Sequence, residues 1–229
     1  MRNRYGLERL AARAASLRAA TVDGIQLRYR ITAAAAPAAR TTVRVYGVIG
    51  ESFWDDGITA AAFAAELDAI GPHGIDLHIN SGGGSVFDAV AMHAALVNHP
   101  SDVTTYIDGV AASAASFLAM AGDQVVIEKP AQMMIHNASG IVLGTKAEMR
   151  DMADLLDQTD SIMAQIYADR SGRPAADFLA AMDRETWYTA AQAVDAGLAD
   201  RVANDTTATA PADRREAAIR ARARQTLGA

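Results

Sequence analysis

The sequence of 229 residues has no cysteine, only two lysines and no long uncharged apolar run. Without cysteine the chain cannot build a disulfide framework, a thiol nucleophile or a thiolate-bound zinc or iron–sulfur site. No stretch approaches the roughly 18–20 apolar residues of a membrane span. The basic start is not followed by the apolar core of a secretory signal. We therefore expect a cytoplasmic protein that makes no use of a membrane.

Motifs for nucleotides and metals are also missing. The glycine-rich segments have neither the G-x-x-x-x-G-K-[ST] spacing of phosphate-binding loops nor the G-x-G-x-x-G spacing of dinucleotide folds. The five histidines include no pair with H-E-x-x-H spacing. We expect no cofactor and no metal, so any use of ATP would have to come from a partner protein.

The charge of the chain is unevenly distributed. The net charge is −6, but residues 1–40 carry +6 and residues 206–229 carry +3, which leaves −15 on residues 41–205. A body this acidic binds nucleic-acid phosphates poorly, so we expect no nucleic-acid partner for it. The composition predicts a basic arm (1–40), a folded body (41–205) and a basic, disordered tail (206–229). We expect the basic ends to contact acidic partners, such as a neighbouring subunit or capsid components.

Strand-like and helix-like patterns alternate along the chain. Short β-branched runs predict strands at 25–31, 43–49, 75–79, 103–107, 125–127 and 133–135. Apolar residues at helical spacing predict helices at 59–70, 85–98, 113–121, 146–170, 175–182 and 190–196. This alternation is typical of an α/β protein whose parallel strands are joined by helical crossovers.

Three segments at the ends of these strands carry chemistry, because ligands bind beyond the carboxyl ends of parallel strands. The glycines at 82–84 leave backbone amides free to hold an oxyanion, although a glycine run alone equally indicates a flexible turn. Ser113 stands among small residues at a helix start, which suits a nucleophile, although capping is the commoner use of serine there. His136 follows an apolar strand, which suits a general base, although a lone histidine is more often structural.

A carboxylate that could orient the histidine is expected between residues 183 and 188. This segment joins two expected helices, and its acidic residues Asp183 and Glu185 run directly into Trp187 and Tyr188. The alternative is that this segment is only a junction between the two helices, which caps a helix end and packs its aromatic side chains.

Taken in order, these segments resemble the ClpP family of serine peptidases. The resemblance rests on residues 79–84, 109–115, 134–137 and 187–200, which follow one another in a single pass over residues 43–203. The Glu-Thr-Trp sequence at 185–187 and the basic ends resemble the ClpP-related head maturation proteases of phages and prophages. The implied fold is a ClpP/crotonase-like spiral of ββα units, with a protruding handle helix at 146–170.

The resemblance also implies roles for individual residues. Ser113 corresponds to the nucleophile and His136 to the general base of the family. The backbone amides of Gly83 and Ala114 correspond to its oxyanion hole.

Other positions depart from the family or extend the site. The acid of the family, usually aspartate, falls on Glu185, whose side chain is one methylene longer, and Asp183 is the alternate acid. Gly82 stands where proline is usual, which implies a more mobile loop. The implied strand-like edge, which would pair with an extended peptide substrate, consists of Gly140, Ile141, Val142, Leu143 and Gly144.

The resemblance implies a serine endopeptidase of peptide or protein substrates, acting in capsid or prohead maturation in the cytoplasm of a bacterial host. It further implies a homo-oligomeric ring, as a heptamer or double ring, in which the handle packs two rings face to face. The alternative is the proteolytic subunit of an ATP-dependent Clp protease working with an AAA+ unfoldase. A crotonase-like acyl-CoA enzyme and an inactive scaffold are further alternatives.

Overall fold

The computed structural model describes residues 30–32, 40–50, 57–71 and 73–204. The expected tail and most of the expected N-terminal arm lie outside these residues. Of the strand expected at 25–31, the described part is β1 (Arg30–Thr32). Within the described ranges, no helix combines the length and the apolar character that crossing a membrane requires.

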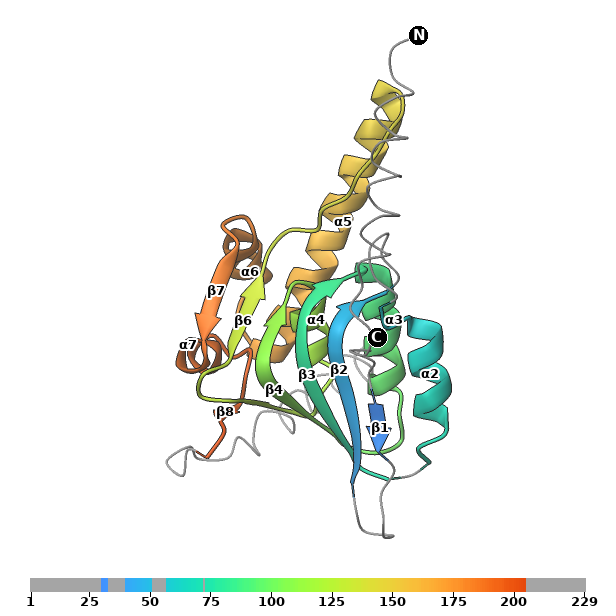
Figure 1. Cartoon of the computed structure of the whole chain (residues 1–229). Coiled ribbons are helices and arrows are strands. Elements are labelled where there is room, and N and C mark those ends of the chain that lie inside the picture. The colour runs from blue at the N-terminus through green and yellow to red at the C-terminus, as the bar shows by residue number, and fades with distance from the viewer. Residues whose placement is uncertain (1–29, 33–39, 51–56, 72, 205–229) are drawn as a thin grey trace, which may run out of the picture.

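An eight-stranded sheet formed by the described residues lies at the centre of the molecule (Figure 1). Its main path runs β1-β2-β3-β4-β5-β8, and its strands are parallel except that β1 lies antiparallel to β2. The path consists of β2 (Thr41–Ile49), β3 (Ile75–Gly84), β4 (Val103–Ala112), β5 (Gln124–Ile127) and β8 (Arg201–Val202). β6 (Gln132–Ile135) pairs in parallel with the end of β4 and antiparallel with β7 (Thr186–Thr189).

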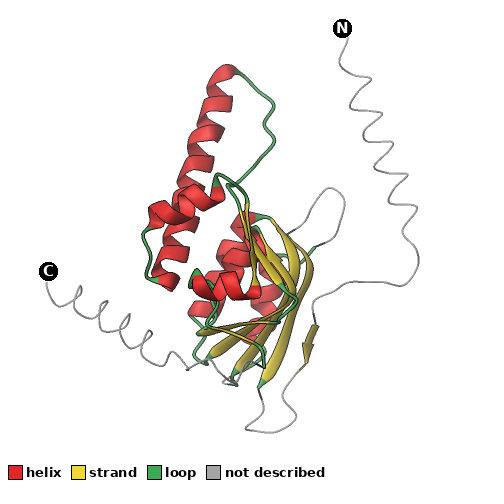
Figure 2. Ribbon diagram, turned by 90° about the vertical axis from the view of Figure 1, so that its left-hand side faces the viewer, coloured by secondary structure: helices red, strands yellow, loops and turns green. Residues whose placement is uncertain are grey.

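The helices begin and end where the local sequence provides caps. They are α2 (Ala60–Asp68), α3 (Val86–Val97), α4 (Ala114–Ala119), α5 (Lys146–Ser171), α6 (Ala175–Met182) and α7 (Ala190–Asp195). The long helix α5 starts at a capping box of Thr145 and Glu148 and ends at Gly172, which adopts the left-handed conformation that glycine favours. Figure 2 shows α5 projecting well beyond the sheet.

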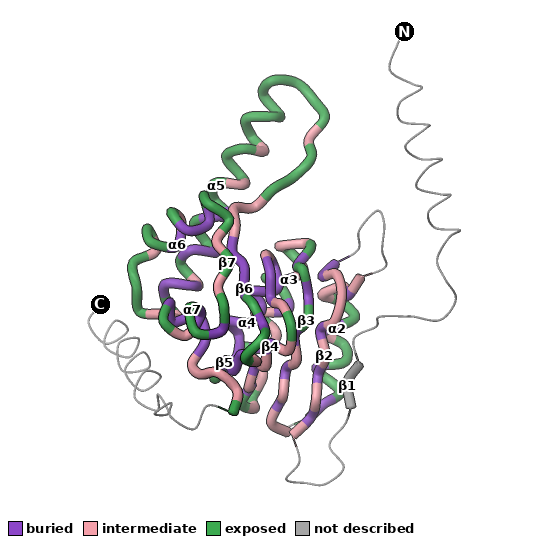
Figure 3. Tube along the Cα trace, turned by 60° about the vertical axis from the view of Figure 1, so that its left-hand side comes forward, coloured by how far each residue is buried: buried purple, intermediate pink, exposed green. Residues whose placement is uncertain are grey.

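Alternation along the strands builds the core. In β2, β3 and β4 every second side chain is buried, including Val43, Leu77 and Ile107, so one face of the sheet packs against helices. The burial map in Figure 3 places the buried residues within the body, while the outer end of α5 and the loop before it are exposed. The expected α/β class, with a mostly parallel sheet and a protruding helix at 146–170, is confirmed.

Several expected boundaries were wrong, because tertiary pairing extends strands beyond their apolar runs. The glycine-rich segment expected to be a mobile loop belongs to β3, where Gly83 and Gly84 pair with Val48 and Ile49. β4 likewise continues through 108–112, where it pairs with β3 and β6. β7 and β8 were not predicted, since four and two residues are too few to show a period.

Two further expectations differ from the structure. Residues 140–144 are mostly exposed and form no strand, because in this single chain no described strand lies beside them to supply backbone hydrogen bonds. Arg40, assigned to the arm, belongs to the body: its guanidinium Nε donates to Asp76 Oδ1 at 2.6 Å and it also binds Asp102.

Candidate active site

Two neighbouring strand ends bring the expected nucleophile and base together. β4 and β6 are parallel and paired up to Ala112 and Met134, so the residues that follow leave the same edge of the sheet. The backbone N–H of Ser113 donates to the Met134 carbonyl at 2.9 Å. Across this junction the Oγ of Ser113 lies 2.7 Å from the Nε2 of His136. This is the geometry in which an imidazole takes a hydroxyl proton.

The backbone of Ser113 is held in a conformation that L-residues avoid. Its φ is 54° and its ψ is −127°, directly before the first residue of α4. The side chain makes no capping hydrogen bond to the helix, so the capping alternative does not describe this serine. Strain of this kind persists where surrounding structure imposes it, and it is common at functional sites.

A buried hydrogen-bond chain helps to impose this conformation. The Ser116 hydroxyl donates to the Ser113 carbonyl at 2.6 Å, and it also lies 2.8 Å from the Tyr167 hydroxyl of α5. Burial raises the pKa of Tyr167, so its hydroxyl stays protonated and available as a donor. The backbone of the nucleophile is therefore linked through Ser116 to Tyr167 of the long helix α5.

The glycine-rich end of β3 lies against the start of α4. A Cβ placed on Gly83 would come within 2.8 Å of the Ser113 Cβ and 3.0 Å of the Ala114 nitrogen, so these segments are in close contact. The Gly83 N–H itself donates to the Ser81 hydroxyl at 3.1 Å, whereas Gly84 lies on the wall of the pocket beside Ser113. Sequence reasoning had not singled out Gly84 as a possible donor, because adjacent glycines look alike in a sequence.

An apolar pocket of about 270 Å³ opens beside the serine and histidine. Its wall includes Ser113, Ala114 and His136, and α5 contributes much of the remainder. The side chains on this wall are mostly apolar and include Val86, Phe87, Met152, Leu155, Leu156 and Met163. Such a pocket accepts an apolar side chain of a ligand and keeps water away from the reacting groups.

Neither carboxylate expected to complete the site hydrogen-bonds His136 in the described part of the chain. Asp183 is exposed, and its Oδ1 accepts a hydrogen bond from the Asn137 amide at 2.8 Å. Glu185 is also exposed, has a positive φ of 47°, and its Oε1 accepts from the Trp187 indole at 3.3 Å. Asp183 therefore contacts the residues that follow His136 (136–138, called here the histidine segment). Glu185 instead bonds the side chain of Trp187 on β7, the strand directly after it in the sequence.

A third carboxylate, which the sequence did not single out, also contacts the residues that follow His136. Asp160 of α5 is buried, and its Oδ1 accepts from the Ala138 backbone N–H at 2.6 Å. Burial raises the pKa of Asp160; the neighbouring Asp157 and Asp183 add to the rise, while the Ala138 amide and His136 oppose it. Helix α5 therefore brings a carboxylate to the backbone two residues after His136.

Comparison with known proteins identifies the family. A model of the Clp protease family matches residues 52–206, and the chain belongs to this family. A mutant ClpP1 from Listeria monocytogenes has the same fold, with a TM-score of 0.63 over 72% of this chain and 92% of that chain. Its sequence is 20% identical, so this likeness concerns the fold alone.

Curated relatives share more of the sequence. ATP-dependent Clp protease proteolytic subunit 2 of Corynebacterium diphtheriae is 35% identical over 130 residues, which cover 56% of this chain and 65% of that protein. ATP-dependent Clp protease proteolytic subunit 1 of Mycobacterium tuberculosis is 33% identical over the same lengths. The match thus spans slightly less than two thirds of these relatives.

Proposed function

We propose that this protein is a serine endopeptidase in which Ser113 is the nucleophile and His136 the general base. The observation that carries the proposal is the 2.7 Å separation of the Ser113 Oγ and the His136 Nε2 beside an apolar pocket. The strained backbone of Ser113 and membership of the Clp protease family support it. They also speak against a crotonase-like acyl-CoA enzyme and an inactive scaffold.

The reaction follows from these groups. His136 takes the hydroxyl proton while the Ser113 Oγ bonds to the carbonyl carbon of a peptide, whose oxygen gains the negative charge. Backbone N–H groups of Ala114 and of Gly83 or Gly84 stabilise this oxyanion, at roughly 3–4 kcal/mol per donor. His136 then passes its proton to the leaving amine as the C–N bond breaks. Water attacks the acyl-enzyme in the same way, and no cofactor enters the cycle.

The pocket indicates the kind of substrate. Its mostly apolar wall favours a peptide with an apolar side chain next to the bond that is cleaved. The exposed segment 140–144 leads away from the pocket, and an extended peptide beside it would supply the strand partner that this segment lacks.

A further proposal concerns the process in which the peptidase acts. The names of the curated relatives favour the proteolytic subunit of an ATP-dependent Clp protease. For such a subunit we propose assembly into a ring and an AAA+ unfoldase as the partner that uses ATP. Capsid or prohead maturation, which the Glu-Thr-Trp sequence and the basic ends favour, becomes the second candidate. The rings would be heptamers or double rings in either case.

The activity is tested with a fluorophosphonate probe and a fluorogenic peptide that has an apolar residue before the bond. We expect stoichiometric labelling of the wild type, localised to Ser113 by mass spectrometry, and loss of labelling and hydrolysis in Ser113→Ala. Ser161→Ala is the matched control, since Ser161 is exposed on α5 and its hydroxyl donates to the Asp157 carbonyl. Labelling that survives in Ser113→Ala, or never occurs, would contradict the assignment.

Folded protein substrates distinguish a proteolytic subunit of a Clp protease from a capsid maturation protease. A proteolytic subunit should degrade a folded protein only when an AAA+ unfoldase and ATP are added, because the chain has no ATP-binding motif. A maturation protease should instead cleave a capsid precursor without ATP.

A further inference from the structure

Asp160 is unusual among the charged residues that the structure describes, because it alone falls in the buried class, with 8% of its surface exposed. A buried carboxylate is costly unless it is hydrogen-bonded or paired with a positive charge. Its neighbours Thr159 and Met163 both lie on the wall of the pocket that contains Ser113 and His136. This stretch of α5 therefore packs at the candidate site, and its aspartate is buried there.

The contacts of Asp160 connect it to the histidine segment. One carboxylate oxygen accepts the Ala138 backbone N–H at 2.6 Å, two residues after His136. That bond holds the carboxylate against the chain that carries the imidazole. The electrostatic interaction between Asp160 and His136 is favourable when the imidazole is protonated. It is also less screened by water than an interaction of an exposed group.

In the described part of the chain, no hydrogen bond joins Asp160, Asp183 or Glu185 to His136, so the three differ in burial and in their other contacts. Asp183 is exposed and already accepts the Asn137 side-chain amide, and Glu185 is exposed and accepts the Trp187 indole. Exposed carboxylates interact with a neighbouring cation through water, which weakens the interaction. Glu185 occupies the family position of the acid, but here the charge buried beside His136 comes from the handle helix.

We propose that Asp160, rather than Asp183 or Glu185, is the positioning carboxylate that orients His136 and stabilises its protonated form. The proposal rests on the peptidase function proposed above. In this role the serine proton moves to the His136 Nε2 and later to the leaving amine, and the Asp160 carboxylate lowers the energy of the imidazolium between these steps. The acid of the site would thus have moved from the junction before β7 to α5.

The decisive variant is Asp160→Asn. Asparagine has nearly the same shape, and its amide oxygen can still accept the Ala138 N–H, but it carries no charge. We expect kcat/KM for the fluorogenic peptide and the labelling rate of Ser113 to fall about a hundred- to ten-thousand-fold. The Tm should stay equal or rise, because burial disfavours the charge that is removed. Asp160→Glu should recover part of the lost rate.

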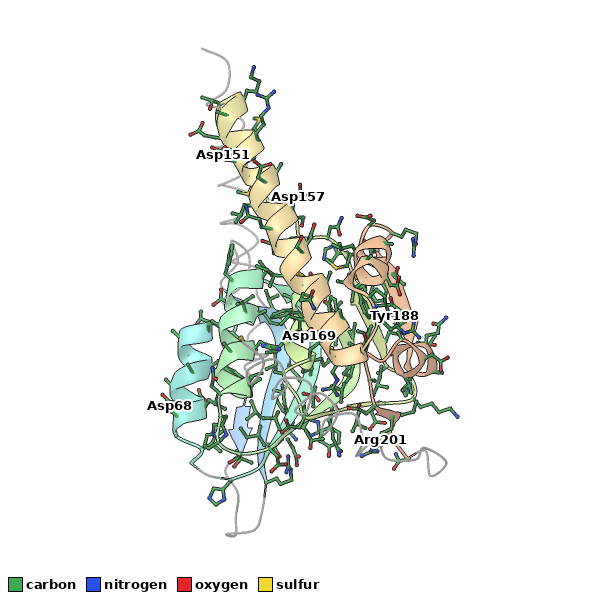
Figure 4. All side chains as sticks on the ribbon, turned by 180° about the vertical axis from the view of Figure 1, so that it is seen from behind. Asp68, Asp151, Asp157, Asp169, Tyr188 and Arg201 are labelled. Carbon is green, nitrogen blue, oxygen red and sulfur yellow. The ribbon has the colours of Figure 1, made fainter. Side chains whose placement is uncertain are left out.

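Three matched variants serve as controls. Asp157→Asn makes the same chemical change on an exposed site of the same helix, and Figure 4 places Asp157 on the projecting part of α5. Asp183→Asn and Glu185→Gln neutralise the rival acids. All three should keep kcat/KM within about threefold of the wild type, since exposed charges act weakly.

A pH profile separates positioning from a purely structural role. The charged and titratable groups that face Asp160 are Asp157 from α5, Asp183 from the junction before β7, and His136 after β6. Loss of the carboxylate removes a favourable partner of the imidazolium, so the acid limb of the kcat/KM profile should move to lower pH in Asp160→Asn. A structural defect would lower the rate without moving that limb.

The outcomes distinguish this proposal from the proposed function. A full rate and an unchanged profile in Asp160→Asn, or a comparable loss in Asp183→Asn or Glu185→Gln, overturns the role of Asp160 while Ser113→Ala still reports on the peptidase. A wild type that neither hydrolyses peptide nor reacts at Ser113 overturns both.

Discussion

Ser113 and the glycines before α3 depend on backbone conformations that few residues tolerate. Ser113 has a positive φ, and Gly83 has a φ of 97° and lies against the start of α4. Such positions store strain that the surrounding hydrogen bonds maintain. Small changes there should alter the reaction more than they alter the fold.

Gly83→Ala tests this at the residue scale. The new Cβ would lie 2.7 Å from the Ala112 carbonyl oxygen and 2.8 Å from the Ser113 Cβ, and the left-handed φ disfavours any side chain. We expect the donors to shift and kcat/KM to fall at least about a hundredfold in the peptide assay. In Gly82→Ala the Cβ would meet nothing within 4 Å, so near-normal activity is expected. Equal activity of the two variants would contradict the role of Gly83.

At the scale of elements, helix α3 packs against α4, the helix that begins directly after Ser113. The ring of His93 on α3 lies 4.9 Å from that of Phe117 on α4, with the planes tilted by 37°. Burial lowers the pKa of His93 to about 4. In the unfolded chain histidine titrates near pH 6.5, so the unfolded state binds more protons between these values. The contribution of His93 to stability is therefore complete above about pH 6.5 and is lost as the pH falls toward 4.

His93→Leu should make stability less sensitive to acid. The wild type is expected to lose roughly 2–3 kcal/mol of unfolding free energy through His93 between pH 7.5 and pH 4, at about 1.4 kcal/mol per pKa unit. Leucine keeps an apolar contact with Phe117 but cannot bind a proton. Urea unfolding of both proteins at the two pH values gives the comparison. The same acid-induced loss in both would show that His93 is not responsible.

The helix α5 combines two roles at the element scale. Its inner part is buried and carries Asp160, Met163 and Tyr167 to the region of the site, while its outer part projects into solvent. The capping box at Thr145 starts the helix where no core supports it. One continuous helix thus connects the projecting end of the molecule to the pocket beside Ser113 and His136.

At the scale of the molecule, several of the exposed large apolar side chains in the described residues lie on α5 and on the loop before it. Ile141 is 92% exposed and Leu143 is 84% exposed in the loop before α5, and Met149 and Ile162 of α5 are about half exposed. Figure 3 shows this projecting region as mostly exposed. Large apolar side chains left exposed in a single chain are typical of an interface, which agrees with the proposed assembly.

The double variant Ile141→Ser and Leu143→Ser should weaken self-association. These side chains are exposed in the single chain, so their loss should leave the Tm of the dissociated chain unchanged while removing apolar area from an interface. Sedimentation velocity at several concentrations should show a shift toward smaller species. Val97→Ser, which removes an apolar group that is 53% exposed at the end of α3, should not cause it. Identical distributions for all three proteins would exclude this loop from the assembly.

Much about this protein was determined by its sequence alone. Alternating strand and helix periods predicted the α/β class, and capping residues placed most helix ends within a few residues. Short motifs placed Ser113 and His136 at strand ends, where ligands bind in such sheets, and the family resemblance predicted that the two would form one site.

Tertiary structure alone decided which backbone and side-chain groups surround that pair. Glycine carries no periodic signal, so only pairing with β2 showed that residues 82–84 extend a strand. In the sequence Asp160 is one of several acidic residues in a long helical pattern. Only the packing of α5 buried it beside the histidine segment, since burial is a property of contacts between distant parts of the chain.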